Sequence, residues 1–217
     1  MTSRERLLAA CRGGSVDRRP RISWLAEDPE ADAQVVTSVR GEQCGGDNRM
    51  LLVDVANPFG LALETGVDIN QMLKDDPSSG GEVLDSLVAA VREQIVAGLD
   101  GGADGIFYRL HGANPRHCSP MQYGGHFLER DRELLCEASD ASLNVLFVAG
   151  GEELYIDFVS DLPTHVFAWD SKLSGLTAGA VRTSRRGALA SSDPAGEIDL
   201  NIGIENYLES LEQTNFG

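Results

Sequence analysis

The sequence is poor in positive charge. Its 18 lysine and arginine residues stand against 34 aspartate and glutamate residues, which gives a formal net charge of −16. A surface of this sign repels phosphate backbones and anionic lipid, and no basic cluster interrupts it. We therefore expect no nucleic-acid binding and no membrane-surface binding. A small anionic substrate is still compatible with this charge, because a pocket can hold local arginines.

Cysteine pairs and long apolar runs are also missing. The four cysteines (Cys11, Cys44, Cys118 and Cys136) form no CxxC motif, which favours reduced intracellular thiols over a disulfide framework. No run reaches the roughly 20 apolar residues that a transmembrane helix needs. The charged N-terminal residues lack the apolar segment of a signal peptide. We expect a cytoplasmic protein.

The composition that remains is that of an ordinary globular domain. The chain has 217 residues, of which 42% are hydrophobic and 24% charged. This is enough for one domain with a sizeable core, and we expect a single domain over residues 1–217.

Strand-like and helix-like segments alternate along the chain. The clearest helix follows the start signal Asp75–Ser79, with apolar residues at a spacing of three and four as far as Leu99. The other expected helices cover residues 4–11, 122–138, 152–159, 175–185 and 204–211. The expected strands are residues 22–25, 50–56, 105–110, 144–148, 165–169 and 187–190.

This alternation predicts parallel strands joined by right-handed βαβ crossovers. A closed barrel and an open doubly wound sheet both satisfy the pattern. No GxGxxG motif follows a strand, so a dinucleotide-binding fold has no direct support.

Six segments carry a family resemblance: residues 4–13 (RERLLAACRG), 16–20 (VDRRP), 57–62 (NPFGLA), 73–77 (LKDDP), 97–106 (AGLDGGADGI) and 188–194 (ALASSDP). Taken in this order, they resemble the uroporphyrinogen decarboxylase superfamily, which includes corrinoid-dependent methyltransferases. The resemblance implies an α/β fold, a (β/α)8 TIM-like barrel with outer helices and a site at the carboxyl ends of its strands. Only six strands are evident, and the family's last strand and histidine-bearing loop have no counterpart. We expect a shortened or incomplete barrel.

The chain departs from that family at several working residues. Residues 26–30 (AEDPE) replace an arginine-bearing loop, which argues against a porphyrinogen with four carboxylates as substrate. Glu64 stands where the family has a tyrosine. Residues 147–150 (FVAG) replace the zinc-binding HxCG motif of the methyltransferase branch, so we expect neither that metal nor another cofactor.

The resemblance implies a carboxy-lyase (decarboxylase) that acts on a small carboxylated or methylated substrate. Two alternatives stay open, namely a relative of corrinoid-linked methyltransferases and a catalytically silent barrel that binds a partner. Besides a small-molecule substrate, the expected partners are a corrinoid protein or a second copy of the chain. A second copy is expected because an incomplete sheet has an exposed edge.

Candidate catalytic residues lie on the expected strands or directly after them. Asp54 lies in an apolar strand, where a carboxylate needs a partner or a function. Arg109 can hold a substrate carboxylate or neutralise Asp54, and His111 can act as an acid or base near neutral pH. The candidate catalytic residues are Asp54, Tyr108, Arg109 and His111.

Other polar and aromatic residues are expected to bind the substrate: Asn57, Phe59, Tyr123, His126, Glu152, Trp169 and Asp170. Residues 150–153 (GGEE) are expected to open a helix directly after a strand, with Glu152 toward the barrel mouth. Asp193 is expected to cap a helix. His111, His117, Cys118 and His126 share a sixteen-residue window, but their irregular spacing favours loop histidines over a metal site.

Overall fold

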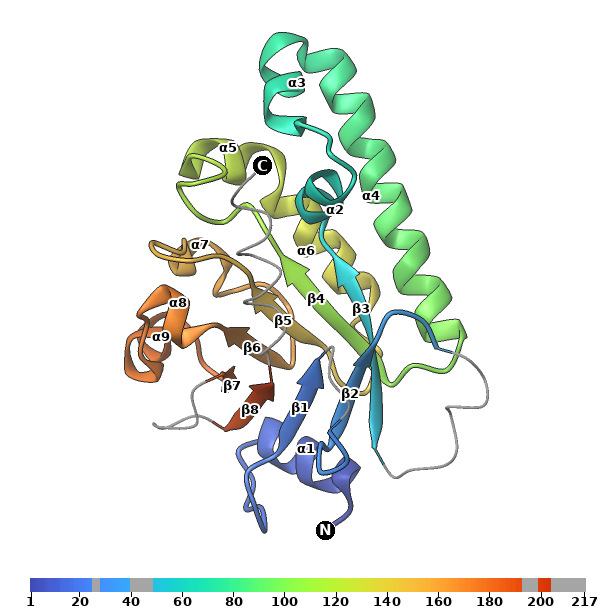
Figure 1. Ribbon diagram of the computed structural model, residues 1–217, viewed down its shortest axis with the longest axis vertical. Coiled ribbons are helices and arrows are strands. Elements are labelled where there is room, and N and C mark those ends of the chain that lie inside the picture. The colour runs from blue at the N-terminus through green and yellow to red at the C-terminus, as the bar shows by residue number, and fades with distance from the viewer. Residues whose placement is uncertain (25–27, 40–48, 193–198, 204–217) are drawn as a thin grey trace.

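Eight parallel strands form a closed barrel in sequence order (Figure 1). This is a computed structural model, and it describes residues 1–24, 28–39, 49–192 and 199–203. The strands are β1 (Arg21–Trp24), β2 (Ala33–Val36), β3 (Met50–Ala56), β4 (Gly105–Leu110), β5 (Val145–Val148), β6 (Val166–Trp169), β7 (Ala188–Ser191) and β8 (Leu200–Gly203). The predicted (β/α)8 fold class is confirmed.

The expectation of an incomplete barrel is wrong. The sequence prediction missed β2 and β8, each of which is four residues long. These strands are stabilised by hydrogen bonding to both neighbours, and β8 pairs with β7 and with β1. Over the described residues the barrel therefore has no edge strand. The reason for expecting a second copy on an open edge no longer holds.

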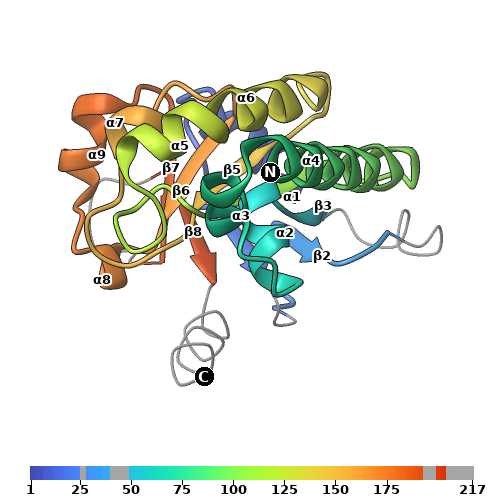
Figure 2. The same ribbon diagram turned by 90° about the horizontal axis from the view of Figure 1, so that it is seen from above.

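Helices lie around the outside of the barrel (Figure 2). They are α1 (Ser3–Cys11), α2 (Pro58–Glu64), α3 (Ile69–Asp75), α4 (Pro77–Asp100), α5 (Pro120–His126), α6 (Leu128–Glu137), α7 (Ile156–Val159), α8 (Ser171–Ser174) and α9 (Ala178–Ser184). The helix expected over residues 122–138 is interrupted at Phe127, which ends α5 and begins α6. The helix expected over 204–211 lies outside the described residues, as do Cys44 and Asp193.

Side chains alternate between two cores along each strand. Met50, Leu52 and Phe107 pack inside the barrel, whereas Val53, Val55 and their neighbours pack beneath the helices. Both faces of the strands are thus buried, as a parallel sheet requires. The alternation places Asp54 and Arg109 on the inner face, and Tyr108 and Trp169 on the outer face.

The N-terminal motifs of the resemblance close the amino-terminal end of the barrel. Arg6 in α1 donates to Asp17 at 2.6 Å and also forms an ion pair with Asp32, which is 0% exposed. Arg18 reaches the same Asp32 carboxylate at 2.8 Å. Figure 1 shows α1 at the opposite end of the barrel from α2 and α5. In the structure these residues hold α1 against the first two strands.

Helices α3 and α4 form a hairpin whose close approach depends on one glycine. A Cβ atom at Gly80 would lie 2.7 Å from the Leu73 backbone of α3. At Gly81, the next residue of α4, a Cβ atom would meet nothing within 4 Å. The two glycines therefore form a matched pair for testing this contact.

We expect Gly80→Ala to lower the free energy of unfolding by about 1–3 kcal/mol, because the α3 backbone must move. Gly81→Ala should raise it by up to about 1 kcal/mol, because alanine favours a helix over glycine. Urea unfolding of both variants measures the two values. Equal effects of the two substitutions would contradict the close contact at Gly80.

Candidate active site at the barrel mouth

Asp54 and Arg109 meet inside the barrel toward the carboxyl ends of β3 and β4. The Nε of Arg109 donates to Oδ1 of Asp54 at 2.7 Å, and its Nη1 lies 2.9 Å from Oε1 of Glu64. The guanidinium also lies over the ring of Trp24, 5.8 Å from its centroid. The structure thus brings two of the predicted catalytic residues together, in the arrangement where Arg109 neutralises Asp54.

This ion pair keeps Arg109 charged although it is largely buried. Burial alone would lower the pKa of Arg109, but the charges of Asp54 and Glu64 outweigh it and the pKa is raised. Burial raises the pKa of Asp54, and Arg109 opposes that shift. A substrate carboxylate would have to compete with two resident carboxylates for this guanidinium.

Asp170 lies directly after β6 and is 1% exposed. Its Oδ1 accepts from the N–H groups of Lys172 and Leu173 at 2.9 and 3.1 Å, which caps α8, and from the Ser192 hydroxyl at 3.2 Å. Its Oδ2 is buried and has no hydrogen-bond partner among the described residues. A buried acceptor without a donor is unfavourable, so this oxygen suits a donor supplied by a ligand.

His111 lies just beyond β4, with its ring against α2. A Cβ atom at Gly60 would come 2.7 Å from Cδ2 of this ring, so only glycine leaves room for it. Burial, together with the charges of Arg109 and His117, lowers the pKa of His111 to about 3. The imidazole is therefore neutral over the physiological range. The expectation that it titrates near neutral pH is wrong.

Tyr108, Tyr123 and Asn57 meet outside the barrel around Asp131 of α6, a carboxylate that the sequence analysis missed. The two tyrosine hydroxyls donate to Asp131 at 2.7 Å each, and Nδ2 of Asn57 donates to it at 3.2 Å. All four side chains are buried. Asp131 follows Phe127 by one helical turn, so its place on the apolar side of α6 was the signal available in the sequence.

Asn57 also fastens the β3–α2 turn to the end of β4. Its Oδ1 accepts from the N–H groups of Gly60 and His111 at 2.8 and 3.0 Å, and its Nδ2 donates to the carbonyl of His111 at 3.1 Å. The polar groups of Asn57 and of both tyrosines are thus used within the scaffold. Their predicted roles in substrate binding and catalysis find no support in these contacts.

The remaining predicted residues lie apart from the Asp54–Arg109 pair. Trp169 is buried on the outer face, and its indole N–H donates to the carbonyl of Leu176 at 3.0 Å. His126 ends α5 and is partly buried. Glu152 is exposed in a loop, because α7 begins only at Ile156. The expectation that residues 150–153 open a helix is wrong, and Glu153 has a left-handed φ of 61°.

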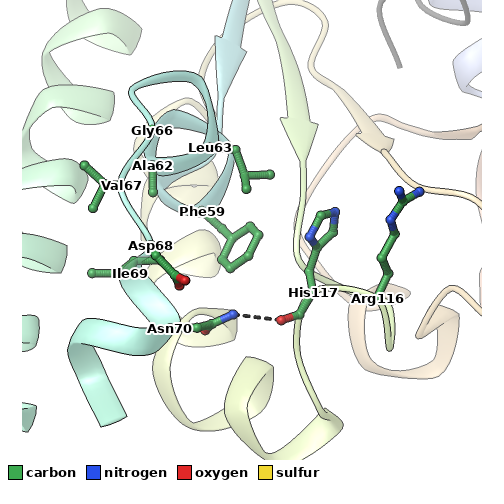
Figure 3. A pocket seen from close by; sticks show the side chains of 10 residues that line it. All are labelled: Phe59, Ala62, Leu63, Gly66, Val67, Asp68, Ile69, Asn70, Arg116 and His117. Atoms are coloured by element: carbon green, nitrogen blue, oxygen red, sulfur yellow. Dashed lines mark hydrogen bonds between the residues drawn. The ribbon is translucent and has the colours of Figure 1, made fainter. Parts of the chain in front are cut away.

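A cavity of about 390 Å³ lies beside the mouth (Figure 3). It is formed by α2, the turn to α3 and the loop after β4. Its lining residues are Phe59, Ala62, Leu63, Gly66, Val67, Asp68, Ile69, Asn70, Arg116 and His117. Of the predicted substrate-binding residues, Phe59 is in this set.

The described residues contain neither a cluster of metal ligands nor a helix suited to span a membrane. Among them, no three His, Cys, Asp or Glu side chains are grouped closely enough to hold a metal ion. The thiol of Cys118 instead accepts a hydrogen bond from Nδ2 of Asn70 at 3.4 Å. No helix of this part of the chain combines the length and hydropathy of a membrane span.

Asp131 predicts a pH dependence of stability with a defined sign. Burial raises its pKa from 3.8 to about 6, and hydrogen bonds from Tyr123, Tyr108 and Asn57 oppose the shift. Between these values the folded protein binds more protons than the unfolded chain. The stability from protonated Asp131 is therefore complete below about pH 4 and lost as the pH rises through about 6.

Asp131→Asn should remove this component, because the amide stays neutral. Over that pH range the wild type should lose roughly 3 kcal/mol of unfolding free energy relative to the variant. Urea titrations at several pH values measure the difference. A difference that is constant with pH would show that Asp131 is not protonated in the folded state at mild acidity.

Comparison with known proteins gives the fold without a family. No family model and no curated protein matches this sequence. A methyltransferase from Methanosarcina mazei superposes with a TM-score of 0.72 at 15% identity, covering 93% of this chain and 92% of that chain. A phosphonopyruvate hydrolase superposes with a TM-score of 0.52 at 10% identity, covering 98% and 85%. These likenesses show the barrel fold alone, and the link to uroporphyrinogen decarboxylases stays a prediction.

Proposed function

We propose that the chain is an enzyme that acts on a small methylated substrate at the barrel mouth, as a relative of methyltransferases. The observation that carries this proposal is the charge balance of the mouth. Arg109 already has two carboxylate partners. In contrast, Oδ2 of Asp170 has no hydrogen-bond donor among the described residues. Such a site favours a ligand that brings hydrogen-bond donors or positive charge.

Asp54 and Glu64 set two carboxylates against the guanidinium of Arg109. Asp170 adds a third carboxylate directly after β6. A methylated ammonium ion would offer its N–H group to Oδ2 of Asp170. A carboxylated substrate would instead have to displace Asp54 or Glu64 from Arg109, and it would add a further negative charge.

Aromatic side chains line the inside of the barrel below the ion pair. The ring of Trp24 lies 5.2 Å from that of Phe107 and 5.5 Å from that of Phe147, between centroids. All three are nearly inaccessible to solvent. They exclude water beneath Arg109 and Asp54, so charges at the mouth act in a medium of low polarity.

The fold comparison is compatible with methyl transfer and also with other reactions. The Methanosarcina mazei methyltransferase matches over nearly the full length of both chains. The phosphonopyruvate hydrolase has the same kind of barrel but is a hydrolase by name, so the fold alone does not identify the reaction. A corrinoid protein as partner is part of this proposal, since it rests on the same resemblance to methyltransferases.

The carboxy-lyase is the second candidate, and Arg109 is the observation that favours it. A guanidinium on the inner face at the end of a barrel strand is placed as a carboxylate-binding group would be. A silent barrel is the third, since Asp54 and Arg109 already satisfy one another and His111 is not part of their ion pair. Binding measurements on defined variants separate the three candidates.

We expect the purified chain to bind dimethylammonium more tightly than acetate. Asp170→Asn replaces the unpartnered acceptor by an amide donor, while asparagine can still cap α8. It should weaken dimethylammonium binding about tenfold or more, which corresponds to about 1.4 kcal/mol. Asp161→Asn, a change at a side chain that is 67% exposed, is the charge-matched control and should leave the affinity unchanged. Isothermal titration calorimetry measures all three proteins.

Tighter binding of acetate, lost in Arg109→Gln, would favour the carboxy-lyase. Binding of neither ion would favour the silent barrel. Methyl transfer itself can be followed by NMR with ¹³C-labelled dimethylammonium and a thiol acceptor, where methylammonium and a methyl thioether are the expected products. A corrinoid protein can be added in a parallel sample to test the expected partner.

A further inference from the structure

The cavity beside α2 is distinct from the cluster of charges at the mouth. Its lining includes neither Asp54, Arg109 nor Asp170. Its volume of about 390 Å³ falls in the range of small-ligand sites, which is roughly 300–1,000 Å³. The turn from α2 to α3 shapes one wall, and Gly66 in that turn adopts a φ of +72° that favours glycine.

An aromatic ring held firmly by its neighbours forms part of the cavity wall. Phe59 is 3% exposed, and the ring of Phe127 packs edge-on against it at 5.2 Å between centroids. At Gly112 a Cβ atom would lie 3.0 Å from Cγ of Phe59, so the loop after β4 also fits closely around this ring. Figure 3 shows Phe59 projecting between α2 and the loop after β4 that carries His117.

A carboxylate and an imidazole lie on opposite sides of this ring. In Figure 3 the Asp68 carboxyl is directed toward the space beside Phe59, and His117 stands on the other side. The centroid of the His117 ring is 5.5 Å from that of Phe59, with the planes inclined at 58°. Oδ1 of Asp68 accepts from the N–H of Gln71 at 3.0 Å, and Oδ2 faces no donor among the described residues.

The cavity lining carries one carboxylate, that of Asp68, and one guanidinium, that of Arg116. Burial, together with the charge of Arg116, lowers the pKa of His117, so this imidazole is neutral at pH 7. The Arg116 side chain runs on the far side of His117 from Phe59 (Figure 3). Of these two charged groups, Asp68 is the one that Figure 3 draws on the same side of His117 as Phe59.

We propose that this cavity is a second small-molecule site, for a planar aromatic molecule that carries an ammonium group. The aromatic part packs against the wall that Leu63, Phe59 and His117 form, and the ammonium donates to Asp68. Asn70 does not compete for the ligand, because its amide donates to the carbonyl of His117 at 2.7 Å. The proposal does not depend on the reaction at the mouth, since no residue is shared between the two sites.

Three probes with one ring and different charge test the proposal: benzylamine, benzyl alcohol and benzoate. We expect benzylamine to bind at least tenfold more tightly than benzoate to the full chain at pH 7, measured by NMR chemical-shift titration. Asp68→Asn should weaken benzylamine about fivefold to tenfold and leave benzyl alcohol unchanged. Asparagine caps a helix as well as aspartate does, so α3 should remain intact.

The structure offers a matched control in a second cavity of the same volume, about 390 Å³, between α7 and α9. Asp157 lines it and accepts from the Ser184 hydroxyl at 2.6 Å. Asp157→Asn changes the net charge as Asp68→Asn does and should leave benzylamine binding unchanged. If Asp157→Asn weakens binding instead, or if benzoate binds as tightly as benzylamine, the proposal is overturned.

The outcome is separable from that of the proposed function. Asp170→Asn should lose dimethylammonium and retain benzylamine, whereas Asp68→Asn should do the reverse. Loss of both ligands in Asp170→Asn would mean that benzylamine binds at the mouth, and the second site would then be refuted.

Discussion

Closure of the barrel is the constraint on which the other features depend. It requires β1 to pair with β8 in parallel, with Ile22 opposite Ile202. Once the eight strands form a closed ring, every strand has one face toward the barrel interior and one toward the helices. Side chains that are neighbours in sequence are then separated by the sheet itself. The ion cluster beneath α1 stabilises this arrangement, because Arg6 and Arg18 converge on the buried Asp32 between the first two strands.

The two faces assign different physical roles to adjacent residues. Arg109 turns inward to Asp54, whereas Tyr108 turns outward to Asp131. The outer network joins β4, α5 and α6, and Asn57 extends it to the turn before α2. A buried carboxylate held by neutral donors is less costly than an unpartnered one, but its desolvation still raises the pKa of Asp131 to about 6. This network gives rigidity to the elements around the mouth and contributes no group to the mouth itself.

The chemistry of the mouth follows from how its charges are distributed. Arg109 would be a strong anion site if it were alone, yet Asp54 and Glu64 already surround it. Oδ2 of Asp170, directly after β6, adds an acceptor without a donor, and the aromatic floor of Trp24 and its neighbours excludes water. The cavity between α2 and the loop after β4 also has a carboxylate, that of Asp68, and an aromatic side chain, that of Phe59, in its lining. A barrel of this kind supports many reactions, so these side chains are the basis of the functional proposals.

Part of the fold and part of the candidate site could be predicted from the sequence alone. The apolar strand 50–56 and the amphipathic segment that became α4 have strong local periodicity, and both were predicted correctly. Asp54 and Arg109 were recognised because charges in apolar strands need partners. By contrast, β2 and β8 are four residues long and depend on pairing with strands distant in sequence, which no local pattern reveals. Tertiary structure decided three further features: the partner of Tyr108, the neutral state of His111 and the unpartnered oxygen of Asp170. The reason is that burial and hydrogen bonding depend on which segments pack together.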